Sequence, residues 1–457
     1  MSLGSRFYRQ KGRVTMDENE LMGSMKVSKA VAKMAIPSVI SSLVTVVYNM
    51  ADTFFVGQTG DPLQVAAVSL TNPIFILFMA FANMFGMGGS AAASMALGEK
   101  KEKRVKQVSS FITYASLIVG IVFAAILLVG MQPVLQLFGA DADTYELAKG
   151  YTTYISYGAP FIIWSAAASF VVRADGASRE AMAGSMIGTM ANIILDPIFI
   201  SGFGMGAAGA AIATTIGNIM ASVYYLWYFC RKSRNMSMAF RYFKCGDRIL
   251  SQVCSAGLPT AIFSALMSIS TIILNQILVA YGNAPVAAIG IVFKANMFIT
   301  FLQMGLANGV QPLLGYSYGA GNRERFLAVE RYTKKCCLIV GVLATALFFF
   351  FREPIIRLFI SDTEVINYGV EMLIAYMISG PVIGILFMNM NCMQSTGNAL
   401  PATILSILRQ GVLLIPVLYG LNALLGLHGV IYGQALTDYV AVLLSIVIWR
   451  WKRRKTL

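Results

Sequence analysis

Two carboxylates lie within long apolar stretches of this chain, where a charged side chain needs a partner or a function. Asp52 follows Tyr48 by four residues, so on a helix the two side chains share one face. Asp196 stands in the same relation to Asn192. A charge in the middle of a membrane is costly, which makes each carboxylate a site candidate. Carboxylate, amide and hydroxyl oxygens suit a proton or a hard cation such as sodium.

The residues around Asp196 add further oxygen atoms. Pro197 follows it and removes the hydrogen bond to the carbonyl group four residues earlier, which bends a helix. Thr214, in the next apolar stretch, could add a hydroxyl group. If Asp52 and Asp196 are close, they could share one proton, and sodium would compete for the same oxygens. Two simpler readings stay open: Asp52 reaches water or bonds only its tyrosine neighbour, and Asp196 caps a helix kink.

The elements that must position these residues are membrane spans. The chain has 457 residues, of which 57% are hydrophobic and 12% charged, and its mean hydropathy is +0.69. Soluble domains carry about 25% charged residues, so an ordinary cytosolic enzyme is excluded. Crossing a bilayer takes about 20 apolar residues. We count twelve such stretches, from 36–58 to 428–449, with the tenth at 365–392. The prediction is an all-α polytopic membrane protein with twelve transmembrane helices.

The basic residues set the expected orientation. Of 35 Lys and Arg, 30 lie in the termini and connections of one side. Only Lys149, Arg352 and Arg357 lie in connections of the other side, while Lys294 and Arg409 fall inside spans. Because cytoplasmic loops collect Lys and Arg, we expect both termini in the cytoplasm. The net charge of +14 then reflects topology, and no nucleic-acid partner is expected.

An internal repeat divides the chain. The basic linker 231–248 separates six spans from six, and an offset near 221 aligns the two halves. The aligned pairs are Val65–Val68 with Val286–Ile289, Gly88 with Gly309, Gly98 with Gly319, Arg104 with Arg325, Pro197 with Pro416 and Gly209 with Gly429. We therefore expect two pseudo-symmetric six-helix bundles with a site at their interface. The expected parts are an N-terminal segment 1–35, bundles 36–230 and 249–449 around the linker 231–248, and a basic tail 450–457.

Catalytic and cofactor motifs are absent from the sequence. Six cysteines show no CxxC spacing and there is one histidine, so neither a zinc site nor a disulfide framework is indicated. No HExxH motif occurs, and no strand is predicted before the glycine-rich stretches, so neither a P-loop nor a nucleophile elbow is indicated. We expect no enzyme activity, no cofactor and no metal beyond sodium at Asp52, Asn192, Asp196 and Thr214.

Four stretches of the sequence resemble the multidrug and toxic compound extrusion (MATE) transporters, closest to their bacterial DinF-like and MepA-like branch. The stretches are YNMADTFFVGQ, ANIILDPIF with GMGAAGAAIATTIGN, GVQPLLGYSYGAGN and RQGVLLIPVLYGL. With the six-plus-six plan, the similarity covers nearly the whole chain.

This resemblance implies a function and a site. It implies a secondary active multidrug efflux transporter that exports lipophilic, often cationic compounds by antiport with H+ or Na+ through alternating access. Its location would be the bacterial cytoplasmic membrane, its partners small-molecule drugs or organic cations and the lipid bilayer, and its functional unit a monomer. The family's ion site in the N-terminal bundle matches Tyr48, Asp52, Asn192, Asp196 and Thr214.

The C-terminal half carries a different set of polar residues. Asn275 falls opposite Asp52 in the repeat, so the carboxylate that some family members place in the seventh span is absent. Ion coupling should therefore depend mainly on the N-terminal bundle. The candidate substrate cavity comprises Asn275, Lys294, Met297, Gln303, Arg409 and Asp438. An ion pair between Asp438 and one of the two bases is the simpler alternative.

A second function stays open from the sequence. A flippase or exporter of an amphipathic lipid-linked or metabolite substrate could use the same two bundles. Lipid-linked substrates carry pyrophosphate, so a cavity rich in Arg and Lys would favour that function, and here only Lys294 and Arg409 are candidates.

Overall fold

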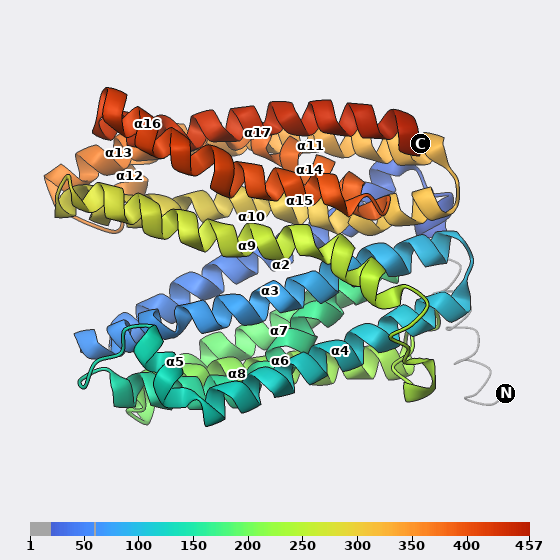
Figure 1. The fold of residues 1–457 in the computed structure, drawn as a ribbon, viewed down its shortest axis with the longest axis horizontal. Coiled ribbons are helices and arrows are strands. Elements are labelled where there is room, and N and C mark those ends of the chain that lie inside the picture. The colour runs from blue at the N-terminus through green and yellow to red at the C-terminus, as the bar shows by residue number, and fades with distance from the viewer. Residues whose placement is uncertain (1–19, 59–60) are drawn as a thin grey trace.

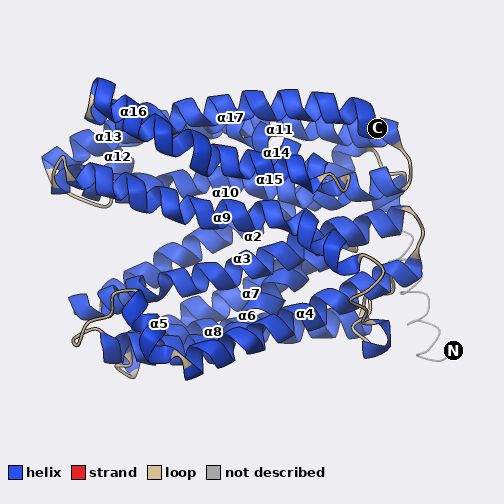
Figure 2. Ribbon diagram, viewed as in Figure 1, coloured by secondary structure: helices blue, strands red, loops and turns tan. Residues whose placement is uncertain are grey.

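The computed structural model describes residues 20–58 and 61–457, and these residues form helices and no strands (Figure 2). Among these residues, eleven helices are long and apolar enough to cross a membrane, and a bent pair of helices counted as one span gives a twelfth. The predicted twelve-span, all-α fold is confirmed. Most of the predicted segment 1–35 lies outside the described residues.

The described part of the N-terminal bundle contains six long helices and two short elements near its connections. Asp61 caps the second long helix by accepting a hydrogen bond from the Leu63 amide at 3.0 Å. The elements are α2 (Val27–Gly57), α3 (Pro62–Gly98), α4 (Glu102–Val129), α5 (Met131–Leu137), α6 (Tyr145–Ala174), α7 (Ser178–Pro197), the π-helix η1 (Ile198–Gly202) and α8 (Gly206–Arg231).

The C-terminal bundle follows a linker that holds only the short 3-10 helix η2 (Phe240–Tyr242). Its elements are α9 (Ile249–Val279), α10 (Asn283–Gly319), α11 (Arg323–Phe350), α12 (Arg352–Arg357), α13 (Thr363–Ile378), α14 (Gly380–Ser395), α15 (Ala399–Ile407), the π-helix η3 (Leu408–Leu413), α16 (Leu414–Leu425) and α17 (Leu427–Thr456).

Three observed boundaries differ from the sequence analysis. The stretch 365–392 is two helices bent by 45°, because Pro381 at the start of α14 has no amide hydrogen to continue α13. Helix α2 begins at Val27, before the predicted start, and α17 continues to Thr456 through the predicted tail, because a helix does not stop where its apolar stretch ends.

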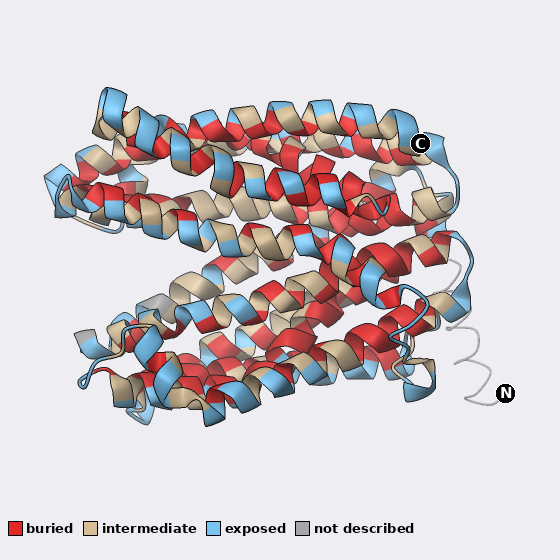
Figure 3. Cartoon of the chain, in the orientation of Figure 1, coloured by how far each residue is buried: buried red, intermediate tan, exposed pale blue. Residues whose placement is uncertain are grey.

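The two bundles lie side by side and meet at one end (Figure 1). We call this the linker end, because it holds the linker 231–248, the connections 99–101 and 320–322, and the C-terminus. Away from it the ribbons of the two bundles diverge toward the opposite end, which holds α5 and α12 (Figure 1). Buried residues gather where α3 passes α9 and α10 toward the linker end (Figure 3).

The contact between bundles repeats across the pseudo-symmetry axis. A Cβ atom on Gly88 of α3 would lie 1.9 Å from the carbonyl oxygen of Val253 in α9. A Cβ atom on Gly309 of α10 would lie 2.8 Å from the Ser38 side chain in α2. Gly88 and Gly309 are a pair that the repeat aligned, so each bundle presents the same close-approach position to the first helix of the other.

Candidate functional site

Asp196 occupies the centre of a buried polar cluster near the end of α7. The residue is fully buried, and its oxygen Oδ1 has no hydrogen-bond partner in the described chain. With its amide nitrogen turned toward Asp196, Asn192 donates to Oδ2 at 2.9 Å. The same orientation lets Asn192 accept from the hydroxyl of Thr214 at 3.1 Å and from its backbone amide at 2.9 Å. Asn192 and Thr214 are buried as well.

Helix α2 brings the other half of the cluster. The Tyr48 hydroxyl lies 3.4 Å from the Thr214 hydroxyl, which links α2 to α8. Asp52, half-buried one turn farther along α2, is close enough to Asp196 to interact with it electrostatically. The structure thus brings together the five residues that the sequence singled out: Tyr48, Asp52, Asn192, Asp196 and Thr214.

The helix break behind Asp196 has a definite form. Directly after Pro197 the backbone widens into the π-helix η1, and such segments are common at functional sites. The π-helix packs tightly on α8, because a Cβ atom on Gly209 would lie 2.8 Å from the carbonyl of Phe199. Proline and glycine therefore act together to set the end of α7 against α8, and this fixes where Asp196 points.

The electrostatics of the cluster are unbalanced. Neither Asp52 nor Asp196 forms an ion pair with a basic side chain among residues 20–58 and 61–457. Two carboxyl groups within electrostatic range of each other, one of them fully buried, are unfavourable when both are ionised and uncompensated. A proton or a cation would relieve this repulsion, and the amide and hydroxyl oxygens beside Asp196 could share in binding a cation.

Two buried charged residues of the C-terminal bundle, Arg409 and Asp438, form an ion pair. The Arg409 Nε atom donates to Asp438 Oδ1 at 2.8 Å, and both side chains are buried. Gln434, one turn before Asp438, donates to the same oxygen at 3.0 Å. Arg409 lies in the π-helix η3, over the rings of Phe263 and Phe387 at 5.3 and 5.7 Å. The ion-pair alternative from the sequence analysis is thus confirmed for Arg409.

Of the remaining predicted cavity residues, Gln303 lies inside the C-terminal bundle. Gln303 is fully buried, and its amide donates to the carbonyls of Cys337 at 2.9 Å and Gly380 at 3.3 Å. It therefore packs between α10, α11 and α14 and is not a cavity residue in this conformation, because its side chain satisfies backbone groups inside the bundle. Asn275 on α9 and Lys294 and Met297 on α10 are half-buried.

Two polar neighbours of these sites were missed from the sequence. Tyr151 on α6 interacts electrostatically with both Asp52 and Asp196. A tyrosine inside an apolar span was the available signal, but nothing in its spacing connects it to α2 or α7. Gln434 could have been found, since the repeat places it opposite Thr214 and it lies four residues before Asp438.

Two six-helix bundles around a pseudo-two-fold axis, with unbalanced carboxylates in one bundle, define a multi-pass membrane transporter. The chain belongs to the MatE family, whose model matches it twice, at residues 37–198 and 259–419. The two matches are offset by the same interval as the internal repeat. Membership of this family makes the protein a transporter and not an enzyme.

Known proteins resemble the chain over almost its full length. Multidrug export protein MepA of Staphylococcus saprophyticus is 32% identical over 422 residues, which cover 92% of this chain and 93% of that protein. A crystal structure of MATE in the straight conformation superposes with a TM-score of 0.90 at 25% identity, over 95% of this chain and 97% of the other. An outward-facing multidrug resistance MATE transporter gives 0.87 at 26% identity, over 94% and 96% of the two chains.

Proposed function

We propose that this protein exports lipophilic, often cationic compounds by exchange for protons or sodium ions. The observation that carries the proposal is the fully buried Asp196, which has one carboxylate oxygen without a partner beside Asp52, Asn192 and Thr214. The name of the MepA relative, a multidrug export protein, supports drugs as the substrate class.

The ion would act by changing which helix packing is preferred. Without an ion, the carboxylates of Asp52 on α2 and Asp196 on α7 repel each other. A bound proton or sodium ion removes the repulsion and favours a closer approach of α2 to α7. Exchange requires only that the ion and the drug favour different packings. Either ion satisfies this requirement, since both use the same oxygens.

The pairing of the buried Arg409 in the C-terminal bundle is compatible with a cationic substrate. A free guanidinium in the transport path would disfavour cations, but Asp438 neutralises Arg409 at 2.8 Å. Lys294 is then the base in a predicted span without an ion pair in the described part of the chain. One lysine is a poor receptor for a pyrophosphate-linked lipid, so drug export is the better-supported of the two functions.

We further propose that the linker end faces the cytoplasm. Most of the Lys and Arg residues of the connections lie at this end, as the positive-inside rule requires. The bundles meet at this end and diverge toward the other, so the conformation would be outward-facing. Its similarity to an outward-facing MATE transporter supports this assignment.

Efflux from proteoliposomes tests the function. The purified protein is reconstituted, loaded with a fluorescent lipophilic cation, and given a pH gradient or a sodium gradient in separate runs. We expect transport under one gradient, and Asp52→Asn or Asp196→Asn should reduce the gradient-driven rate at least about tenfold, since a neutral amide cannot exchange a proton or balance a cation.

The exposed Asp143 provides a matched control, because Asp143→Asn makes the same chemical change at a solvent-exposed residue outside the cluster. That variant should transport at the wild-type rate. If Asp52→Asn and Asp196→Asn both keep full gradient-driven efflux, the proposed coupling is wrong. If the wild type transports nothing under either gradient, drug export itself is in doubt.

A further inference from the structure

Two arginines at the linker end, Arg104 and Arg325, form hydrogen bonds between the two bundles and lie outside the polar cluster around Asp196. Arg104 is near the start of α4 and Arg325 is near the start of α11, and the internal repeat aligns them. Each one donates to at least one backbone carbonyl oxygen in the segment that precedes the first helix of the opposite bundle.

Arg325 forms the larger of the two contacts. Its Nε donates to the carbonyl of Met22 at 2.8 Å, its Nη1 to that of Met25 at 2.8 Å, and its Nη2 to that of Leu21 at 3.0 Å. These carbonyls belong to the segment that leads directly into α2 of the N-terminal bundle. Leu21 and Met22 are buried against the core of the C-terminal bundle. Arg325 therefore fastens the entry of α2 to the partner bundle.

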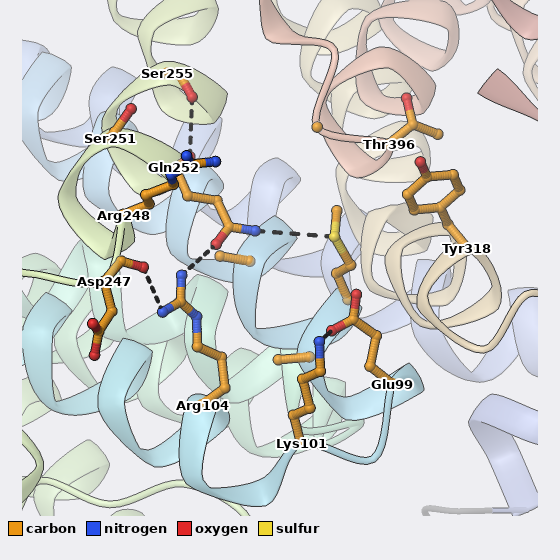
Figure 4. A pocket seen from close by; sticks show the side chains of 14 residues that line it. Glu99, Lys101, Arg104, Asp247, Arg248, Ser251, Gln252, Ser255, Tyr318 and Thr396 are labelled. Carbon is orange, nitrogen blue, oxygen red and sulfur yellow. Dashed lines mark hydrogen bonds and ion pairs between the residues drawn. The ribbon is translucent and has the colours of Figure 1, made fainter. Parts of the chain in front are cut away.

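Arg104 makes the corresponding contact on the other side of the axis. Its Nη1 donates to the carbonyl of Asp247 at 2.8 Å and its Nη2 to the Gln252 side chain at 3.0 Å (Figure 4). Asp247 and Arg248 immediately precede α9, the first helix of the C-terminal bundle, and both have left-handed backbone with φ of 55° and 62°. Non-glycine residues rarely adopt that conformation, so contacts must hold this turn in place.

The environments of the two arginines differ. Arg104, Asp247 and Gln252 line a cavity of about 640 Å³ between the ends of α3, α9 and α10 (Figure 4). Arg325 binds three carbonyls where Arg104 binds one carbonyl and one flexible side chain. A hydrogen bond beside open space competes with water, whereas a guanidinium that binds three carbonyls has most of its donors satisfied.

We infer that Arg104 and Arg325 form a pseudo-symmetric pair of clasps that hold the two bundles closed at the linker end. The inference rests on the proposed transport function, since alternating access requires this end to open. Each clasp ties one bundle to the entry of the other bundle's first helix. The halves of α2 and α9 near those entries are the ones that pack against α10 and α3. Releasing the clasps therefore favours the state in which the linker end is open.

Distance measurements between spin labels test the clasps without drug or ion gradient. Lys103 and Glu324 are exposed, lie one residue before the two arginines, and belong to different bundles. They are replaced by labelled cysteines in protein held in lipid nanodiscs. Cysteines that a label could reach are first replaced by serine, namely Cys230, Cys245, Cys254 and Cys336, while Cys337 and Cys392 are buried and remain.

The expected result is a shift toward longer distances. Arg325→Ala should raise the ratio of open to closed molecules by about tenfold, because hydrogen bonds from a charged donor each contribute on that scale. Arg104→Ala should shift the ratio less, and the double variant more than either. Arg325→Lys should resemble Arg325→Ala, since an ammonium group cannot reach three carbonyls in the fork of a guanidinium.

A neighbouring arginine separates the clasp from a general effect of charge. Arg323 is exposed at the start of the same helix, and Arg323→Ala should leave the distances unchanged. The thermal midpoint of each variant is measured in parallel, and if Arg325→Ala unfolds, Arg325→Lys carries the test. A double variant with the wild-type distance distribution would overturn the inference. So would an equal shift in Arg323→Ala. Neither result depends on the coupling ion, so the efflux experiments stand apart from this one.

Discussion

Gly98 and Gly319 occupy equivalent positions where the ends of α3 and α10 cross. A Cβ atom on Gly98 would lie 2.2 Å from the carbonyl oxygen of Tyr316, and one on Gly319 would lie 2.1 Å from that of Met95. Gly98 lies three residues after Met95, and Gly319 lies three residues after Tyr316. Each glycine therefore faces a carbonyl group about one helical turn before the other glycine. The crossing is therefore symmetric about the axis between the bundles, and it leaves no room for a methyl group on either side.

Adding that methyl group should loosen the crossing. We expect Gly98→Ala or Gly319→Ala to weaken packing by about 1–3 kcal/mol, the usual effect of overfilling a tight contact. The thermal midpoint should fall and the linker end should open more often. The measurement is thermal unfolding in detergent together with labelling of a cysteine placed at Ser94, which is fully buried beside Gly315.

Gly246→Ala in the linker, where a Cβ atom meets nothing within 4 Å, should behave as wild type. Equal effects at Gly98 and Gly246 would contradict the packing argument.

The hydroxyl of Thr214 should contribute to ion affinity. It lies 3.1 Å from the Asn192 side chain and 3.4 Å from the Tyr48 hydroxyl. Thr214→Val keeps the shape but removes the oxygen, which costs about 1.5 kcal/mol and raises the ion concentration for half-maximal efflux about tenfold. Titrating efflux against sodium or pH measures this shift. Thr214→Ser restores the hydroxyl and should stay near wild type, so identical titrations of the valine and serine variants would show that the oxygen has no role.

Breaking the Arg409–Asp438 pair should destabilise the C-terminal bundle. Asp438→Asn leaves a buried guanidinium without its counter-ion, a change that costs about 3–5 kcal/mol in such sites. The double variant Arg409→Met with Asp438→Asn should be more stable than Asp438→Asn alone, because no unpaired charge remains. Thermal unfolding in detergent measures both.

An exposed ion pair serves as the reference for this test. Arg357 and Glu353 lie 2.7 Å apart with more than half of each side chain exposed. Breaking that pair with Glu353→Gln should change stability by less than about 1 kcal/mol. If Asp438→Asn is no more harmful than Glu353→Gln, the pair in the C-terminal bundle is not a buried one in solution.

Asp175, in the connection between α6 and α7, should make the linker end sensitive to pH. Its carboxylate accepts hydrogen bonds from Tyr228 at 2.8 Å, Ser233 at 2.6 Å and Asn235 at 3.0 Å, yet burial raises its pKa above the usual value. The folded protein therefore binds a proton at Asp175 more tightly than the unfolded chain does. The stability that this tighter binding provides is present below about pH 4, the unfolded value, and is lost as the pH rises through the folded pKa.

Asp175→Asn should remove the stability that the Asp175 carboxyl group contributes at low pH. The difference in thermal midpoint between wild type and variant should favour the wild type most near pH 4 and should shrink toward pH 7. Thermal scans of both proteins across this range provide the measurement. A difference that stays constant with pH would mean that Asp175 has the same pKa in the folded and unfolded protein.

The sequence by itself predicted the fold class and the pairs of site residues that lie on one helix. Helical spans follow from composition and length, because an apolar stretch in lipid must satisfy its backbone hydrogen bonds internally. The pairs Tyr48 with Asp52 and Asn192 with Asp196 follow from helical spacing, which is a local property. The repeat aligned Arg104 with Arg325 for the same reason, since a constant offset can be read along one chain.

Contacts between helices were decided only by the tertiary structure. Spacing along the chain carries no information on which faces of α2, α6 and α7 meet, so Tyr151 stayed unrecognised beside Asp52. Gln303 was read as a cavity residue because a polar residue in a span can face either a cavity or its own bundle. The arginine clasps depend on carbonyl oxygens, which every residue possesses and no sequence pattern marks. The positions of the charged residues, the spans and the repeat can thus be read along the chain. The contact partners of each side chain are decided by how the helices pack.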